Sequence, residues 1–139
     1  RHLIKLWNQT VSPDDEVWHL GDLAFGSKEY IENIVKQLNG TKLIILGNHD
    51  KRGKSWFHDI GFDYVFKKPV TIRDVTFSHE PIIDLSYDTF NVHGHIHNMD
   101  VSQIEGYDVQ THFNVSADVI GFRPISFESV LGGEDYGIQ

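Results

Sequence analysis

Lys-Leu-Ile-Ile-Leu-Gly-Asn-His-Asp, residues 42–50, is the stretch that decides the fold. Its first half, residues 42–46, is a nearly continuous apolar run, which is typical of a strand buried on both faces of a sheet. The strand leads directly into Gly47-Asn48-His49-Asp50, which offers an amide, an imidazole and a carboxylate. The stretch therefore predicts a buried sheet whose strand ends carry the chemistry.

Three further short motifs repeat this arrangement. They also place metal-capable side chains directly after predicted strands: Gly21-Asp22, Ser78-His79 and Gly94-His95-Ile96-His97. Because neighbouring strands of one sheet finish at the same edge, we expect the four motifs to converge in space. Carboxylate, amide and imidazole donors together predict a site for divalent metal ions.

The remaining pattern predicts a mixture of helices and short strands. Strands over residues 16–20 and 42–46, with a helix over residues 27–39 between them, predict a parallel crossover unit. Gly40 is the expected stop of that helix. Its expected buried stripe is Tyr30, Ile31, Ile34, Val35 and Leu38. The other expected helices lie over residues 1–10 and 54–60 and after Pro124, and the other strands over residues 64–66, 70–72, 75–77, 90–92 and 113–116.

Composition and charge narrow the class of protein. The chain has 139 residues, and we expect residues 1–139 to form a single domain. It has no cysteine, which excludes disulfides and thiolate ligands, and no apolar run approaches the ~20 residues of a transmembrane helix. We therefore expect a cytoplasmic protein. The net charge of −8 disfavours broad binding to nucleic-acid backbones, but it leaves a phosphate substrate open.

Each motif also has a purely structural interpretation. Asp22 can cap the turn that follows it, and residues 48–50 can form turn hydrogen bonds only. A lone histidine such as His79 is usually a structural hydrogen bonder. His95 and His97 are different, because alternate residues of an extended segment project to the same side and suit two adjacent metal ions. Structural roles are expected for the other histidines: His2, His19, His58, His93 and His112.

The ordered set Gly-Asp, Gly-Asn-His-Asp, Ser-His-x-Pro and Gly-His-x-His resembles the calcineurin-like metallophosphoesterases, most closely their small single-domain members from bacteria and phages. The resemblance covers essentially the whole chain and extends to Asn114-Val-Ser-Ala-Asp118 and Arg123-Pro124. It implies an α/β fold of the α/β/β/α sandwich type, in which two mixed sheets are flanked by helices.

The resemblance also implies which residues hold metal ions. Asp22 would bridge two divalent cations. Asn48, His79 and His95 would complete one site, and His97 would belong to the other. Mixed carboxylate, amide and imidazole ligation favours manganese, with iron, nickel or zinc as alternatives. Metal binding is expected to fail below roughly pH 6, because imidazole ligands must be neutral.

The implied reaction is hydrolysis of phosphate esters, phosphodiesters more than monoesters, by a hydroxide that bridges the two metal ions. His49 would act beside the substrate phosphate, assisted by Asp50. Arg52, which follows this loop, could hold a phosphate through a bidentate contact, although a solvated loop face is the commoner role for such a residue. The small size favours a small or accessible substrate, with nucleotides among the candidates.

One departure from the family pattern leaves alternatives open. The family opens with an Asp-x-His motif on its first strand, and no Asp-x-His occurs in these 139 residues. We therefore expect an N-terminally truncated domain in which one metal site lacks two ligands. The competing hypotheses are a non-catalytic binding scaffold on the same fold and an inactive fragment. Retention of His49 and Asp50 disfavours the scaffold, which has no use for a proton-transfer pair.

Overall fold

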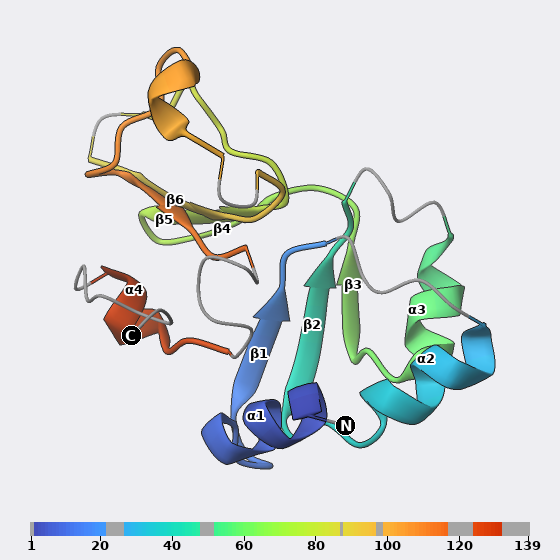
Figure 1. Ribbon diagram of the computed structural model, residues 1–139. Coiled ribbons are helices and arrows are strands. Elements are labelled where there is room, and N and C mark those ends of the chain that lie inside the picture. Colours follow the sequence, from blue (N-terminus) through green and yellow to red (C-terminus); the bar gives the residue numbers. More distant parts are fainter. Residues whose placement is uncertain are drawn as a thin grey trace.

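The first sheet is built from three parallel strands. In the computed structural model, β1 (Glu16–His19), β2 (Thr41–Ile45) and β3 (Tyr64–Phe66) lie side by side in that order (Figure 1). Four of the five residues of the central strand β2 are buried, as expected for an apolar strand covered on both faces. The structure describes residues 2–21, 27–47, 52–86, 88–96, 99–116 and 124–131.

The second sheet has mixed strand directions. Its order is β4 (Val70–Ile72), β5 (Val75–Ser78), β6 (Phe90–His93) and β7 (His112–Asn114). β4 and β5 pair antiparallel across the turn at Arg73-Asp74, whereas β5–β6 and β6–β7 pair in parallel. The parallel pairs bring the ends of β5 and β6 to one edge of this sheet.

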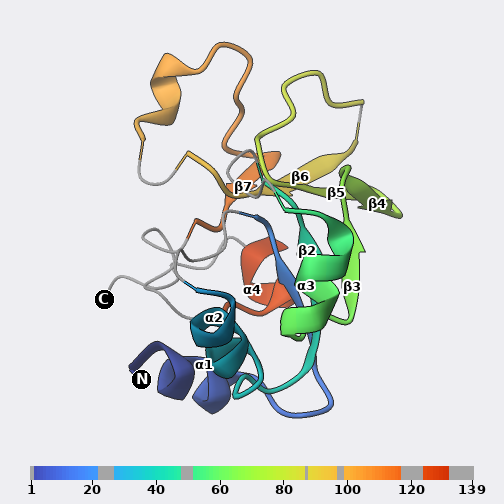
Figure 2. The ribbon, with the colours of Figure 1, turned by 90° about the vertical axis from the view of Figure 1, so that its right-hand side faces the viewer.

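Helices cover the first sheet, and a short helix packs between the sheets. The helices are α1 (His2–Thr10), α2 (Lys28–Val35), α3 (Lys54–Ile60) and α4 (Phe127–Leu131), with a 3₁₀ turn η1 (Val101–Gln103). Figures 1 and 2 show α2 and α3 together beside the first sheet. Their apolar faces and that sheet share one core cluster, which consists of Ile31, Val35, Ile44, Phe57, Ile60, Phe62 and Val65. Among the described residues, no helix is both long and apolar enough to cross a membrane.

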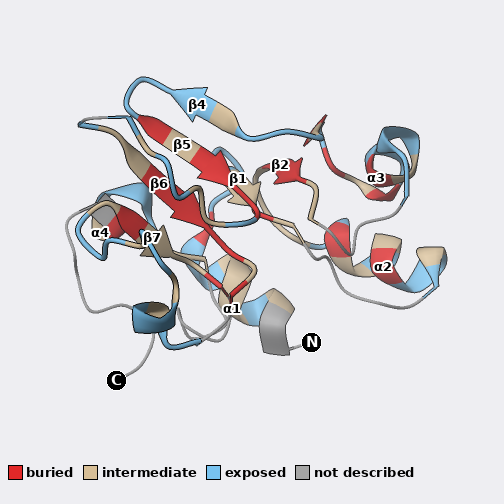
Figure 3. Cartoon of the chain, turned by 90° about the horizontal axis from the view of Figure 1, so that it is seen from above, coloured by how far each residue is buried: buried red, intermediate tan, exposed pale blue. Residues whose placement is uncertain are grey.

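A second core lies between the two sheets. The Trp18 ring of β1 stacks on Phe66 and Phe77, with ring centroids 5.7 and 5.2 Å apart. Val130 of α4 belongs to the same cluster. Figure 3 shows the buried residues concentrated along β2, β5 and β6. These aromatic contacts join the two sheets, since Phe66 is in the first sheet and Phe77 in the second.

Loops cover the outer face of the second sheet. The loop over residues 79–89 and the segment over residues 99–111, which contains η1, lie on that side (Figure 2). The fold-class prediction is confirmed: two sheets pack face to face, with helices at their flanks. The crossover unit of residues 16–46 is confirmed as well, because β1 and β2 pair in parallel around α2.

The end of α2 differs from the prediction. The helix ends at Val35 with Lys36 as its cap, not at Gly40. The amides of Gln37 and Leu38 donate to carbonyls three residues back, so the chain tightens into 3₁₀-type turns. Gly40 instead serves close packing, because a Cβ there would lie 2.9 Å from the carbonyl oxygen of Asp15, directly before β1. The predicted set of buried residues on this helix is also too large, because Tyr30 belongs to it and is 59% exposed.

Candidate functional site

The ends of four strands meet at one place. A Cβ atom built on Gly21, just after β1, would lie 2.6 Å from His79 Nδ1 and 2.7 Å from the backbone nitrogen of Gly47. A Cβ on Gly94, just after β6, would lie 3.7 Å from the Leu20 carbonyl oxygen. Both sheets therefore contribute to this edge, whereas the four motifs were predicted to lie at the edge of one sheet.

His79 is fixed in one orientation. Its side chain is buried, and its Nδ1 atom lies 2.7 Å from the carbonyl oxygen of Leu20. Because a carbonyl can only accept a hydrogen bond, Nδ1 carries the proton and donates it. The Nε2 atom of neutral His79 then presents a lone pair. The backbone is held too, since the Gly94 amide donates to the His79 carbonyl at 2.9 Å.

His95 completes a pair with His79. The Nδ1 atom of His95 lies 3.0 Å from Nε2 of His79, and the two rings meet edge to face with centroids 4.7 Å apart. Since His79 Nε2 accepts, His95 Nδ1 is the donor between the rings. Each histidine thus directs one specific nitrogen to a common point.

The backbone at His95 is not extended. Its φ is 70°, and the Ile96 amide donates to the Gly94 carbonyl at 2.8 Å. A hydrogen bond from residue i+2 to residue i around a positive φ is the pattern of the γ-turn, which is rare and strained. The expectation that His95 projects from an extended segment is therefore wrong, because β6 ends at His93 and the chain turns at once.

The pair fits a divalent cation. Imidazole nitrogens bind zinc at about 2.0–2.1 Å, so two nitrogens roughly 3 Å apart can share one ion. The proton between the rings is the one that such a cation would replace. Gly21 and Gly47 bring the backbone to this point directly before Asp22 and Asn48, the residues predicted to supply oxygen donors.

Five of the predicted site residues lie outside the described residues: Asp22, Asn48, His49, Asp50 and His97. Within the described part of the chain, no group of three or more histidine, cysteine or carboxylate side chains that could hold a metal ion is found. The ligand assignments therefore remain predictions, with His79 and His95 as the two members whose geometry is described.

Arg52 is described and has a distinct contact. Its guanidinium carbon lies 4.0 Å from the centroid of the Trp56 ring, in a cation–π arrangement. Trp56 belongs to α3 and also meets Phe57 edge to face. The Trp56 indole, to which the sequence analysis assigned no role, thus holds the arginine that follows the Gly47-Asn48-His49-Asp50 motif in the sequence.

A buried polar network lies behind the histidine pair. His93 is fully buried; its Nδ1 donates to the Gly94 carbonyl at 2.9 Å, and its Nε2 lies 2.8 Å from the Tyr107 hydroxyl. Burial, with smaller effects from nearby histidines, lowers the pKa of His93 from 6.5 to about 4. His112 is buried beside Tyr107, and its Nε2 donates to the Ile82 carbonyl at 2.7 Å. Both histidines have structural hydrogen bonds.

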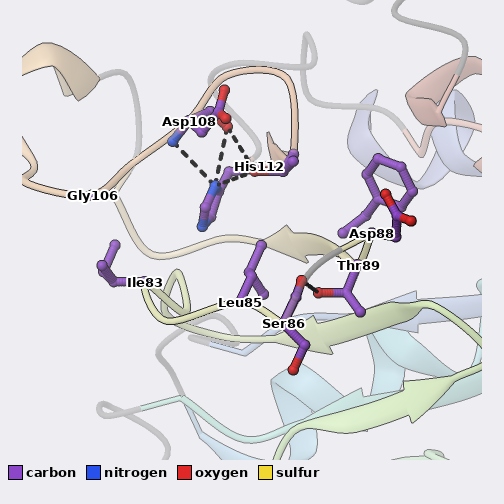
Figure 4. Close-up of a pocket in the computed structure, with 10 residues that line it drawn as sticks. Ile83, Leu85, Ser86, Asp88, Thr89, Gly106, Asp108 and His112 are labelled. Atoms are coloured by element: carbon purple, nitrogen blue, oxygen red, sulfur yellow. Dashed lines mark hydrogen bonds between the residues drawn. The ribbon is translucent and has the colours of Figure 1, made fainter.

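A surface pocket of about 370 Å³ lies between the two outer loops. Figure 4 shows Asp108 and His112 on one side and Leu85, Ser86 and Thr89 across from them. The whole lining is Ile83, Leu85, Ser86, Asp88, Thr89, Phe90, Gly106, Asp108, Thr111 and His112. Because Phe90 begins β6, the pocket reaches the start of that strand, whereas the histidine pair lies beyond its end.

Glu80 was missed by the sequence analysis. Its Oε2 atom lies 3.6 Å from His95 Nε2. The carbonyl of Leu20, which orients His79, was missed as well. A backbone oxygen gives no signal in the sequence, and Glu80 could have been found only from its place directly after His79.

Comparison with known proteins gives a family match, related sequences and a solved structure with the same fold. The family model described as calcineurin-like phosphoesterase matches residues 1–134. An uncharacterised protein of Methanocaldococcus jannaschii is 31% identical over 135 residues, which are 93% of this chain and 71% of that protein. The Gene 66 protein of a Mycobacterium phage is 42% identical over 53 residues, 36% of this chain and 27% of that protein. A crystal structure of a protein of unknown function from Aquifex aeolicus has the same fold, with a TM-score of 0.71 at 21% identity over 93% of this chain and 81% of that one.

Proposed function

From the premise that this chain belongs to the calcineurin-like phosphoesterase family, we propose that it hydrolyses phosphate esters with two divalent metal ions, phosphodiesters in preference to monoesters. Manganese is the proposed metal, because the mixed oxygen and nitrogen donors of the motifs suit it. The proposed substrate is small or accessible, and nucleotides are candidates.

The observation that carries this proposal is the histidine pair. His79 Nε2 and His95 Nδ1 face one another at 3.0 Å, and the Leu20 carbonyl fixes the tautomer of His79 that leaves its Nε2 lone pair for a ligand bond. A bonded carbonyl on the other ring nitrogen is typical of histidines that bind metals. The same contacts also give the pair one defined geometry before any ion binds.

The remaining ligands are proposed from the sequence motifs. Asp22 would bridge the two ions, Asn48 would join the histidine pair, and His97 would bind the second ion. The bound cations would supply an activated water and neutralise charge on the phosphate oxygens. This proposal is supported by the convergence of Gly21 and Gly47, which directly precede Asp22 and Asn48, with His79 at one edge of the molecule.

The proposed residues for proton transfer and substrate binding follow β2 in the sequence. His49 would donate a proton to the leaving oxygen, with Asp50 holding its ring, a role worth about 10²–10⁴ in rate. Arg52 would bind a phosphate oxygen through the edge of its guanidinium. Its face is already stacked on Trp56, which reduces the freedom lost on binding.

Steady-state hydrolysis of bis(para-nitrophenyl) phosphate and para-nitrophenyl phosphate tests this function. We expect activity that requires Mn²⁺ and is higher on the diester. His79→Gln and His95→Gln should each lower kcat/KM by more than about 100-fold, since losing a ligand costs more than the 10–100-fold typical of losing an outer-shell partner. His58→Gln is the control, because His58 is on α3 and bonds the Phe62 carbonyl. Activity that survives chelation, or that His79→Gln leaves intact, would contradict the proposal.

A further inference from the structure

The carboxylate of Glu80 faces the second ring nitrogen of His95. Its Oε2 atom is 3.6 Å from His95 Nε2, the nitrogen that does not face His79. The side chains are 62% and 30% exposed for Glu80 and His95, so this contact is at the solvent side of the pair. Glu80 is thus placed to act on the orientation of His95.

The backbone of Glu80 is anchored by buried polar groups. The Ser78 hydroxyl donates to the Glu80 carbonyl at 2.6 Å, and Asn91 Nδ2 donates to the Ser78 hydroxyl at 2.9 Å. Asn91 Oδ1 in turn accepts from the Ile82 amide at 2.9 Å, and both Ser78 and Asn91 are buried. Pro81 further restricts Glu80 to extended backbone. The backbone that carries the Glu80 side chain is therefore held by buried hydrogen bonds directly after β5.

The proton positions give this carboxylate a specific effect. Because His79 Nδ1 donates to the Leu20 carbonyl, His79 Nε2 must accept from His95 Nδ1–H in the metal-free pair. For His95 Nδ1 to bind a cation, the one proton of the neutral ring must lie on Nε2 instead. A carboxylate 3.6 Å from Nε2 favours that tautomer electrostatically, since its negative charge stabilises the positive end of the Nε2–H bond.

We propose that Glu80 is a positioning residue for the metal site: it selects the His95 tautomer whose Nδ1 atom is open to a cation and holds the ring in place. Glu80 does not itself bind the metal or the substrate. The inference rests on the proposed function, because it requires a cation at the histidine pair.

Calorimetric titration of the metal-free protein with Mn²⁺ near neutral pH tests this role. Glu80→Ala should weaken metal binding by about 10–100-fold, as is typical of an outer-shell partner. Glu80→Gln should lose less, because its amide oxygen keeps a partial negative charge near His95 Nε2 although the full charge is gone. Glu105→Ala is the control, since Glu105 is an exposed carboxylate on the other outer loop, and it should leave the affinity unchanged.

Two further readouts separate positioning from a general structural effect. The unfolding free energy of the metal-free protein should be the same for Glu80→Ala and the unmodified chain. Heteronuclear NMR of the zinc-loaded protein should place the His95 proton on Nε2.

Three results would overturn the inference. If Glu80→Ala binds Mn²⁺ as tightly as the unmodified protein, the contact is a surface ion pair without consequence. If Glu80→Gln loses one ion per chain, Glu80 is a direct ligand and not a positioning residue. If the unmodified protein binds no Mn²⁺, the proposed function fails and this inference fails with it; the first two results leave the proposed function standing.

Discussion

Gly21 occupies a position where no other residue fits. Its φ is 98°, a conformation that residues with a Cβ rarely adopt. A Cβ there would also lie 2.6 Å from His79 Nδ1 and 2.7 Å from the Gly47 nitrogen. The missing side chain lets the end of β1 approach the end of β2 and the His79 ring.

Gly21→Ala should therefore lower the free energy of unfolding by about 2–4 kcal/mol, from backbone strain and overpacking together. It should also weaken Mn²⁺ binding, because the His79 ring has to move. Urea unfolding of the metal-free protein measures the first effect. Gly53→Ala is the matched control: its φ is −78° and a Cβ there meets nothing within 4 Å, so its cost should stay below about 1 kcal/mol. Equal stability of the two variants would contradict the account of Gly21.

At the scale of elements, the turn after β6 is the feature with the clearest strain. β6 ends at His93, and the Ile96 amide then closes a three-residue turn on the Gly94 carbonyl around His95. A non-glycine residue at φ 70° is held there by its surroundings. The strained turn aims Nδ1 of His95 at His79, which an extended continuation of β6 would not do.

A pair of substitutions at His95 isolates this strain. Both His95→Ala and His95→Gly remove the imidazole, but only alanine keeps the Cβ that opposes a positive φ. We expect the glycine variant to be more stable than the alanine variant by about 1–2 kcal/mol. At an ordinary helical position the order is reversed: Asn33→Ala on α2 should be more stable than Asn33→Gly by about 1 kcal/mol. The same order at both positions in urea unfolding would show that the turn is unstrained.

Elements with strong local signals could be predicted from the sequence. The bounds of α3, β3 and β4 match the structure residue for residue, because glycine, proline or a two-residue turn delimits each apolar run. The end of α2 could not be predicted, since Leu38 continues the helical spacing while the backbone has already tightened after Val35. The turn at His95 was also missed, because its geometry depends on contacts from β5 and not on local sequence.

At the scale of the whole molecule, the site needs both sheets. Gly21 and Gly47 follow strands of the first sheet, whereas His79 and His95 follow strands of the second. The core between the sheets, against which Trp18 packs, holds the two sheets in place relative to each other. The order of the motifs predicted that these residues converge, but it could not reveal the Leu20 carbonyl or Glu80, whose roles arise only from the packing of the sheets.

The buried network behind the site makes stability depend on pH. The pKa of His93 is lowered from 6.5 to about 4, chiefly by burial and to a smaller extent by the neighbouring His112, His95 and His79, while its hydrogen bond to the Gly94 carbonyl opposes the shift. Protonation of the His93 ring is therefore less favourable in the folded protein than in the unfolded chain, where the ring takes up a proton below pH 6.5. The stability that His93 contributes is present above pH 6.5 and is lost as the pH falls toward 4.

The expected loss of unfolding free energy between these limits is about 3 kcal/mol from His93 alone. Urea unfolding of the metal-free protein at several pH values measures it. His93→Asn should flatten the pH dependence. NMR of the His93 ring provides a second measurement, in which the imidazole next to Tyr107 stays neutral well below pH 6.5. Protonation of that ring near its ordinary pKa, or an unaltered slope in His93→Asn, would refute this assignment.

The central claim is that His79 and His95 form part of a divalent metal site, and the Mn²⁺ content per chain after equilibrium dialysis tests it most directly. The account predicts that the protein retains Mn²⁺, that the double variant His79→Gln/His95→Gln loses it from this site, and that His58→Gln retains as much as the unmodified chain. Equal Mn²⁺ content in the double variant and the unmodified protein would contradict the claim.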